Sequence, residues 1–236
     1  MQALEEIRRA LEQLSFGDRL AIGRWLQELD RVTEFAVREP AATSAMTDSP
    51  FMTLQEFFEF EEHSRVRHEY VDGVVFAMSG ASVAHERVRH RLVMGIGNHL
   101  KSSPCQVFSS SMQLVIKREA SEICYYPDVM VDCRREAWGR HFVRNPTLVV
   151  EILSPSTQLT DRREKLQNYR LIDSVQEYVL AAQDEPVLTI YRRADGWRPE
   201  LCVGSATLAE FRSIGLMLPL SDVYEGIVPQ GDGSEQ

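Results

Sequence analysis

The sequence has few cysteines, no long apolar run and no close metal-binding spacing, and each lack excludes a class of protein. No stretch approaches the ~18 apolar residues that a membrane-spanning helix needs. The 4 cysteines, at positions 105, 124, 133 and 202, include no Cys-x-x-Cys pair and no close Cys/His spacing. This pattern argues against a zinc site and against a disulfide framework, so we expect reduced, partly buried thiols.

Signatures of other enzyme classes and of export are also missing. Gly95-Ile-Gly97 has neither a third glycine nor a preceding strand, so no phosphate-cradling loop is predicted. The serine-rich stretches lack a Gly-x-Ser-x-Gly elbow, and no catalytic triad can be assembled. The first residues, MQALEEIRRALEQL, form a charged amphipathic pattern without the apolar core of a signal peptide, so we expect a cytoplasmic protein.

The composition is that of an ordinary globular protein, but the charge is unevenly spread. The 236 residues are 44% hydrophobic and carry a formal net charge of -9. Residues 85–170 contain 14 basic and 9 acidic side chains, whereas the segments before and after them are acidic. A basic middle is compatible with a polyanion site, whereas the acidic total weighs against a tight, indiscriminate DNA binder.

The N-terminal part is predicted to be separate from the rest. Apolar residues recur at helical spacing from Leu4 to Leu14 and again from Ile22 to Val32, so residues 1–38 are expected to form a helical hairpin. This hairpin is either a packing or dimerising appendage or a partner-binding element. Residues 39–50, with small side chains and two prolines, are predicted to be a linker; residues 51–225 form one domain, and 226–236 a flexible tail.

From Met52 onward the pattern mixes strands and helices. Thr53 and Glu56 form a capping box that opens a short helix, and Asp72-Gly73 between two β-prone runs predicts a hairpin. Helices are also predicted over residues 84–101 and 161–172, and strands over 107–117, 126–133, 148–153, 177–181 and 187–191. We therefore expect an α/β (α+β) fold with a mixed central sheet flanked by helices.

Two carboxylates stand out because they interrupt apolar strands. Glu151 lies within Leu148-Val-Val-Glu-Ile-Leu153, whose residues are apolar on both faces, and an ionised carboxylate buried there needs a cation. Either an arginine or a metal ion could supply this positive charge. Asp128 stands at the start of a second β-run, 23 positions earlier, which is enough chain to bring the two acids together. Such oxygen ligands suit Mg²⁺, although two unrelated strand-end acids are the alternative.

Lys165 is a third candidate, on the helix that follows Glu151. It shares a helix face with Asp161 and Tyr169, so it is either an exposed lysine in a weak pair or a cation carried back over the same sheet edge.

These residues and their surroundings resemble the Uma-two family, a large bacterial group described as restriction endonucleases within the PD-(D/E)xK nuclease superfamily. The resemblance is carried by Pro127-Asp128, by Glu151-Ile-Leu-Ser-Pro-Ser-Thr157, and by Asp161 and Lys165. Upstream, His68-Glu-Tyr-Val-Asp-Gly73 and Gly80-Ala-Ser-Val-Ala-His85 match as well. It extends over roughly residues 52–220.

The resemblance implies a restriction-endonuclease-like core with a metal site. Asp128 and Glu151 would bind Mg²⁺, with Mn²⁺ as a substitute, and Glu69 would join or support them. The lysine that the superfamily places two residues after the second acid is replaced by Leu153, and the resemblance implies that Lys165 takes its role. The predicted function is then phosphodiester hydrolysis by a metal-activated water, with Lys165 stabilising charge or orienting that water.

Further residues are candidates for binding the substrate, DNA. They are His85, which matches a family position; Gln113, which could hold a water or the backbone; and Arg134 and Arg135, in a basic loop around Trp138. Arg87, Arg89 and Arg91 either follow a phosphate backbone or form a solvated helix face. A homodimer is expected by analogy with enzymes that cut two strands. The alternative to an enzyme is a non-catalytic module that binds nucleic acid or assists assembly, since Leu153 departs from the superfamily pattern.

Overall fold

The protein is described from a computed structural model. The described residues are 52–78, 80–118, 121–134, 138–154 and 160–227. The predicted hairpin of residues 1–38, the linker of residues 39–50 and most of the predicted tail lie outside this part, so these domain assignments stay predictions. Within the described residues, no helix is both long and apolar enough to span a bilayer.

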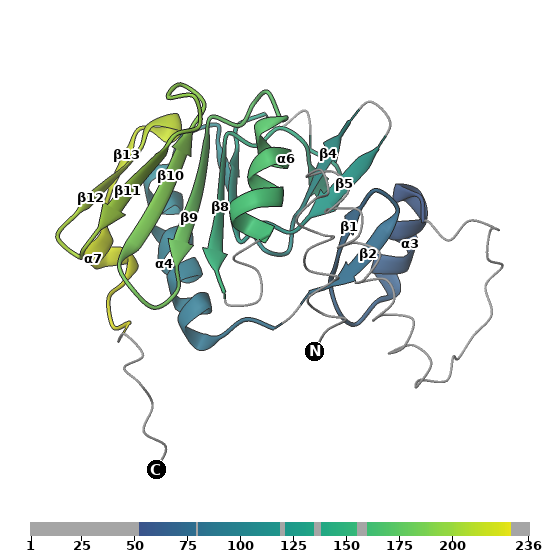
Figure 1. Ribbon diagram of the computed structural model, residues 1–236, viewed down its shortest axis with the longest axis horizontal. Helices are drawn as coiled ribbons and strands as arrows, with labels where there is room; N and C mark the ends of the chain where they lie inside the picture. The colour runs from purple at the N-terminus through teal and green to yellow at the C-terminus, as the bar shows by residue number, and fades with distance from the viewer. Residues whose placement is uncertain (1–51, 79, 119–120, 135–137, 155–159, 228–236) are drawn as a thin grey trace, which may run out of the picture. The chain divides into compact units, whose positions relative to one another are not determined.

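The larger sheet has six strands in the order β11-β10-β9-β8-β6-β3 (Figure 1). They are β3 (Gln106–Ser109), β6 (Val129–Asp132), β8 (Leu148–Leu153), β9 (Glu177–Ala182), β10 (Val187–Arg192) and β11 (Pro199–Val203). β8 and β9 pair in parallel, and the other neighbours pair antiparallel. The predicted mixed central sheet is therefore confirmed, and β8 is buried along nearly its whole length because it is covered on both faces.

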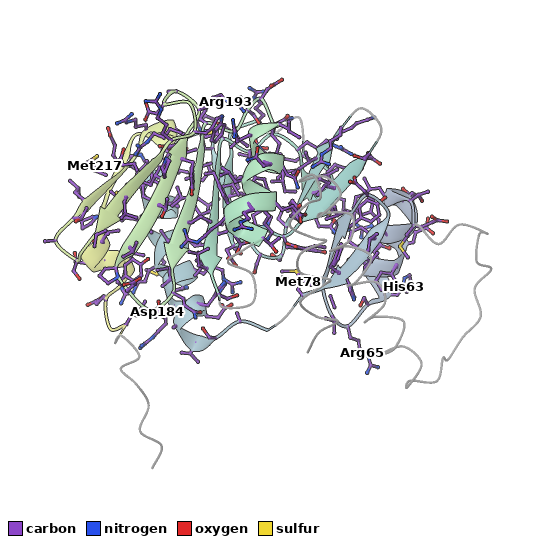
Figure 2. The ribbon with its side chains drawn as sticks, viewed as in Figure 1. His63, Arg65, Met78, Asp184, Arg193 and Met217 are labelled. Atoms are coloured by element: carbon purple, nitrogen blue, oxygen red, sulfur yellow. A yellow bond between two sulfur atoms is a disulfide. The ribbon has the colours of Figure 1, made fainter. Side chains whose placement is uncertain are left out.

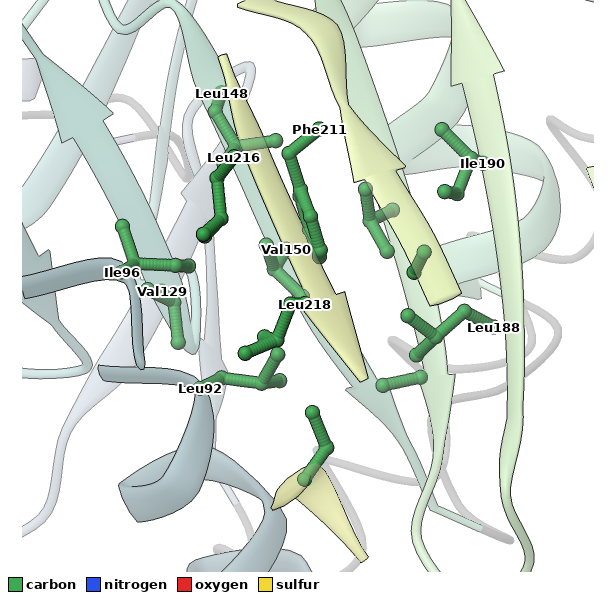
Figure 3. Close-up of a cluster of buried hydrophobic side chains, with 14 of the residues drawn as sticks. Leu92, Ile96, Val129, Leu148, Val150, Leu188, Ile190, Phe211, Leu216 and Leu218 are labelled. Atoms are coloured by element: carbon green, nitrogen blue, oxygen red, sulfur yellow. The ribbon is translucent and has the colours of Figure 1, made fainter. Parts of the chain in front are cut away.

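One face of this sheet is covered by α4 (Val83–His99), the β12–β13 hairpin (Leu208–Phe211 and Leu216–Pro219) and α7 (Leu220–Val223). Strand alternation decides which side chains of β13 join the core: Leu216 and Leu218 point inward, whereas Met217 lies on the outer surface (Figure 2). Figure 3 shows the resulting cluster, in which Leu92 and Ile96 of α4 face the strands. Their spacing of one helical turn produces this continuous apolar stripe.

The opposite face carries the helix that was predicted over residues 161–172. It consists of a π-helical turn, η2 (Asp161–Lys165), followed by α6 (Leu166–Arg170). Tyr169 and Tyr178 belong to a second core, which also contains Leu114 and Ile123 of a smaller sheet. In this core the two sheets and the helix pack against one another, so side chains from all three can lie close together.

The smaller sheet has five strands in the order β2-β1-β5-β4-β7. They are β1 (His68–Val71), β2 (Val74–Ala77), β4 (Gln113–Lys117), β5 (Glu122–Tyr125) and β7 (Phe142–Val143). The predicted hairpin is confirmed, because Asp72 and Gly73 both have positive φ, at 51° and 94°, and join β1 to β2. The predicted capping box is also confirmed at the start of α3 (Leu54–His63).

The single strand predicted over residues 107–117 was wrong. The chain turns between Ser109 and Met112, where the Met112 N–H donates to the Ser109 carbonyl at 3.0 Å. β3 therefore pairs in the larger sheet and β4 in the smaller one. Ser109-Ser-Ser111 interrupt the apolar pattern at the turn, but β-prone residues on both sides allow one long strand, and periodicity does not show which sheet each half joins.

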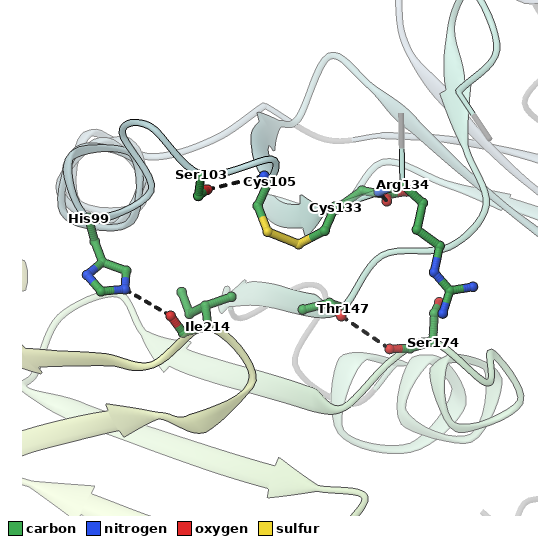
Figure 4. Close-up of a disulfide and its surroundings, with 9 residues drawn as sticks. His99, Ser103, Cys105, Cys133, Arg134, Thr147, Ser174 and Ile214 are labelled. Atoms are coloured by element: carbon green, nitrogen blue, oxygen red, sulfur yellow. Dashed lines mark hydrogen bonds between the residues drawn. A yellow bond between two sulfur atoms is a disulfide. The ribbon is translucent and has the colours of Figure 1, made fainter. Parts of the chain in front are cut away.

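The expectation of four reduced cysteines was also wrong. Cys105 and Cys133 form a disulfide, whereas Cys124 and Cys202 are free and buried (Figure 4). The pairing of β3 with β6 places Gln106 opposite Asp132, and it therefore brings the two cysteines together although 28 positions separate them. Sequence spacing carries no signal for a contact that strand register creates.

Candidate active site

Asp128 and Glu151 meet at one edge of the larger sheet. β6 and β8 pair antiparallel with Val129 opposite Val150, so the residues flanking this pair are neighbours. The Asp128 backbone N–H donates to Glu151 Oε2 at 3.2 Å, and the Ile152 N–H donates to Asp128 Oδ2 at 2.8 Å. The strand register thus holds both carboxylates side by side, with Glu151 only 3% exposed.

Lys165 completes this cluster from η2. Its Nζ lies 3.1 Å from Glu151 Oε1, 2.9 Å from Glu69 Oε1 and 3.4 Å from Asp161 Oδ1. The lysine is 6% exposed, so the alternative of a solvated surface lysine does not hold. β1, β8 and η2 each contribute one or more of these charged groups.

Aromatic side chains hold the lysine-bearing helix in place. Tyr125 donates to Glu164 at 2.8 Å, and Asn168 Nδ2 donates to the Tyr125 hydroxyl at 2.6 Å. The Lys165 ammonium lies 5.2 Å from the centre of the Tyr125 ring, within the range of a cation–π contact. Lys165 is therefore fixed before any substrate arrives, which is what electrostatic catalysis requires.

The charges of this cluster perturb one another. Burial raises the pKa of Glu151 to about 8, with Lys165 opposing the shift and the Asp161, Asp128 and Glu69 carboxylates adding to it. Burial lowers the pKa of Lys165, but the Glu151, Glu69 and Asp161 carboxylates outweigh this effect and raise it well above its ordinary value. Lys165 is therefore a permanent cation and not a base.

His85 approaches Asp128 from the first turn of α4. Ser82 caps this helix by accepting from the His85 N–H at 3.1 Å, which aims the imidazole at the sheet edge. His85 Nε2 lies 3.2 Å from Asp128 Oδ2, and its Nδ1 is buried without a hydrogen-bond partner. Thus the histidine that was predicted to bind substrate borders the two acids.

A family model matches this chain over residues 54–221, which include Glu69, Asp128, Glu151 and Lys165. The matching family is Uma2, which is described as "Putative restriction endonuclease". The chain belongs to the Uma2 family. The family resemblance that the sequence motifs predicted is thereby confirmed, and this Uma2 protein carries the nuclease-type fold that the resemblance implied.

Similar proteins extend over most of this Uma2 chain. A Synechocystis protein, slr1290, described as uncharacterized, is 32% identical over 188 residues, which are 79% of this chain and 98% of that protein. A second Synechocystis protein, sll1609, also described as uncharacterized, is 32% identical over 135 residues, or 56% of this chain and 75% of that one. A crystal structure from Anabaena variabilis, described as a putative nuclease belonging to DUF820, matches with a TM-score of 0.60 at 19% identity. It covers 73% of this chain and 97% of its own, and it shows the fold that the two proteins share.

The residues of this Uma2 site fit a hard divalent cation held by two carboxylates. Three carboxylates, Glu69, Glu151 and Asp161, surround the Lys165 ammonium group, and Asp128 lies beside Glu151, so carboxylates outnumber the lysine. Glu69 Oε1 and Asp161 Oδ1 are buried without a hydrogen bond and rely on their ion pairs with Lys165. Mg²⁺ typically binds through one or two carboxylates, waters and substrate phosphate. In the described ranges, no three His, Cys, Asp or Glu side chains form a ready metal-ligand group; Asp128 and Glu151, which lie side by side, are the two carboxylates that could hold such an ion.

Within the described ranges, the other predicted substrate-binding residues make no hydrogen bond or ion pair with Asp128 or Glu151. Gln113 is buried and donates to the Tyr126 hydroxyl at 2.8 Å, and Tyr126 in turn donates to Glu61. Arg134 is exposed and follows the far end of β6, about 20 Å along the strand from Asp128 at ~3.3 Å per residue. Arg135 lies outside the described residues.

Two buried residues of the site were not among the predicted functional residues. Asp161 is 2% exposed and pairs with Lys165, and Tyr169 donates to Glu151 Oε1 at 2.7 Å. Both lie four positions from Lys165, so the helical period places them on its face. That spacing was the available signal, but it does not reveal that the face is buried.

Proposed function

We propose that this Uma2 protein is a Mg²⁺-dependent DNA endonuclease that hydrolyses phosphodiester bonds. The observation that carries the proposal is the contact of Asp128, Glu151 and Lys165 at one sheet edge, with all their linking distances at or below 3.2 Å. Structural ion pairs also perturb pKa values, but here the carboxylates outnumber the single cation, which favours a site for a further cation.

Each residue has a role that its contacts support. Asp128 and Glu151 would hold a divalent ion, which would supply positive charge for the phosphate oxygens and would lower the pKa of a bound water. Lys165 presents a fixed ammonium group to the charge that develops on the phosphate. Asp161 and Glu69 keep this lysine protonated, and the Tyr169 hydroxyl orients the Glu151 carboxylate.

The remaining features of the proposal concern the substrate and the setting. The basic middle of the chain, residues 85–170, supports a polyanionic substrate such as DNA. A homodimer would bring two sites to the two strands, and a cytoplasmic setting would place the protein with its substrate.

The test is cleavage of DNA by the purified full-length chain. Duplex and single-stranded DNA are incubated with Mg²⁺, with Mn²⁺ and with a chelator, for the wild type and for Asp128→Asn. We expect cleavage that requires the metal and disappears in the variant. Cleavage that persists in the chelator, or that Asp128→Asn retains, would contradict the proposal.

A second candidate function rests on the same contacts. Because Lys165 already pairs with Glu151, the cluster is also compatible with a fold-stabilising ion network in a non-catalytic nucleic-acid-binding module. Binding of Mn²⁺ measured by calorimetry separates the two functions. Affinity that Asp128→Asn weakens supports the enzyme, whereas DNA binding without any metal binding supports the module.

A further inference from the structure

Two arginines converge beside Asp128, and neither belongs to the metal-and-lysine cluster. The β3–β6 pairing sets Ser109 opposite Val129, so Ser110, the first residue of the turn after β3, follows at the end of β3 that is nearest to Asp128. Arg67 Nη1 donates to the Ser110 carbonyl oxygen, and Arg89 Nη1 donates to the Ser110 hydroxyl. Two guanidinium groups from different parts of the chain therefore meet at Ser110, at the end of β3 that faces the start of β6.

The elements that carry these arginines also carry the site. Arg89 lies one helical turn after His85, so it is on the same face of α4 as the imidazole that contacts Asp128. Arg67 immediately precedes β1, which supplies Glu69, and its guanidinium lies 5.5 Å from the centre of the Tyr126 ring. Both arginines therefore stand on segments next to residues of the candidate site.

The other arginines of α4 have different partners. Arg87 donates to the Gly226 carbonyl oxygen, and Arg91 pairs with Glu225, so both contact the segment after α7. The sequence left two alternatives for these three arginines, a phosphate-binding face or a solvated face, and the structure shows that they do not share one face. Arg89 faces the site, whereas Arg87 and Arg91 do not.

The charge balance at Ser110 favours an anionic ligand. Two guanidinium groups share this residue, and Glu86 is the one carboxylate that pairs with either of them in the described part of the chain. Each guanidinium has five N–H donors in a planar fork, and the fork matches the oxygens of a phosphate. Because Arg67 is exposed and Arg89 partly so, their remaining donors are open to such a ligand.

We propose that Arg67 and Arg89 form a binding subsite for a backbone phosphate of the substrate strand, next to the phosphate that is cleaved. This inference rests on the proposed function and extends it, because it makes a polynucleotide a better substrate than an isolated phosphodiester. The subsite positions the strand through its backbone and is independent of base sequence.

The experiment compares two substrates with one set of variants. One substrate is a DNA duplex, and the other is bis(p-nitrophenyl) phosphate, a single phosphodiester without neighbouring phosphates. The variants are Arg67→Gln and Arg89→Gln, with Arg65→Gln as the matched control, because Arg65 is exposed and points away from the strands (Figure 2). Thermal unfolding of each variant reports whether the fold is intact.

We expect Arg67→Gln and Arg89→Gln each to lower kcat/KM for DNA about tenfold more than for the small diester. The slope of log K against log salt for DNA binding should fall by about 1 in each variant, since each loses one phosphate contact. Arg65→Gln should change neither quantity.

Equal losses on both substrates, with a lower unfolding midpoint, would show that the arginines only brace the β3–β4 turn, and would overturn the inference. A salt slope that stays at the wild-type value would overturn it as well, as would a wild-type protein that binds no DNA at low salt. Failure of the proposed function is a different result: the wild type would hydrolyse neither substrate with Mg²⁺ or Mn²⁺, while the salt slopes would still report on the subsite.

Discussion

The chain contains two buried ion networks, and they differ in how well their charges are matched. At β9 and β10, Arg192 and Glu177 are each 2% exposed in their side chains and pair at 2.8 Å. At the candidate site, Lys165 faces Glu151, Glu69 and Asp161, with Asp128 beside Glu151. Both networks lie in the same domain, on adjoining strands.

The first network satisfies its acceptors completely. Glu177 Oε1 accepts from Arg192 and from the Arg212 backbone, and Glu177 Oε2 accepts from the Ser213 backbone and hydroxyl. In the second network, burial raises the pKa of Glu151 to about 8, and two carboxylate oxygens lack hydrogen bonds. The complete hydrogen bonding of the first network matches a purely structural role, whereas the unsatisfied carboxylate oxygens of the second leave room for the proposed cation.

Breaking the Arg192 network should have the largest effect on stability. Arg192→Met leaves Glu177 buried without its cation, which typically costs about 3–5 kcal/mol of unfolding free energy. We expect a correspondingly lower urea midpoint, and a smaller loss for Lys165→Met, because burial raises the pKa of Glu151 to about 8 and Glu151 can remain protonated without the lysine. Comparable losses in the two variants would remove the distinction between the networks.

Asp128→Asn should affect function and leave the fold intact. Removing one charged group from a preorganised site typically lowers the turnover number about 10²–10³-fold. We expect a loss of this size in Mg²⁺-dependent cleavage, and weaker Mn²⁺ binding in calorimetry. The matched control is Glu177→Gln, for which we expect lower stability with the turnover number of the folded fraction retained.

The pH dependence of stability should also distinguish the networks. Burial raises the pKa of Glu151 from 4.5 to about 8, so between these pH values the folded, metal-free protein keeps a proton that the unfolded chain has lost. Its stability therefore falls as the pH rises through this window, by up to about 1.4 kcal/mol per pH unit.

The measurement is urea unfolding in a chelator at about pH 5 and about pH 8, at the two ends of the window. Glu151→Gln should flatten the dependence, because the amide does not titrate, and Mg²⁺ should offset it in the wild type. A wild-type curve that rises with pH between these values would refute the assignment.

Glu69→Gln should give the smallest effect and should separate two roles for Glu69. The predicted role as a metal ligand implies that Mn²⁺ affinity falls at least tenfold. Its contact with Lys165 at 2.9 Å implies instead that cleavage falls about tenfold while Mn²⁺ affinity changes little. Calorimetry and cleavage rates on the same preparation decide between them, with Glu62→Gln as the control, because Glu62 is an exposed residue of α3.

Much of the fold could be predicted because its signals are local. The Asp72-Gly73 turn needs positive φ at two residues, and the Thr53 capping box satisfies the first helical N–H groups, so both are encoded within four residues. The division between β3 and β4 was missed because it depends on which sheet each strand joins. The Cys105–Cys133 disulfide was missed for the same reason.

The candidate site was partly predictable. Asp128 and Glu151 could be singled out because a charge within an apolar strand requires compensation wherever the strand lies. The partners of Lys165 could not be predicted in this way. Glu69, Glu151 and Asp161 come from β1, β8 and η2, and these elements meet only after the two sheets pack. Arg67 and Arg89 meet at Ser110 for the same reason, although 22 positions separate them.

The sequence by itself determined the mixed strand-and-helix pattern, the hairpin turn, the family and the two carboxylates that require a cation. These follow from side-chain chemistry and from periodicities that extend over a few residues. The tertiary structure decided which cation meets those carboxylates, which cysteines pair and which arginine of α4 faces the site. Those contacts depend on strand register and sheet packing, which join residues that are far apart in the chain.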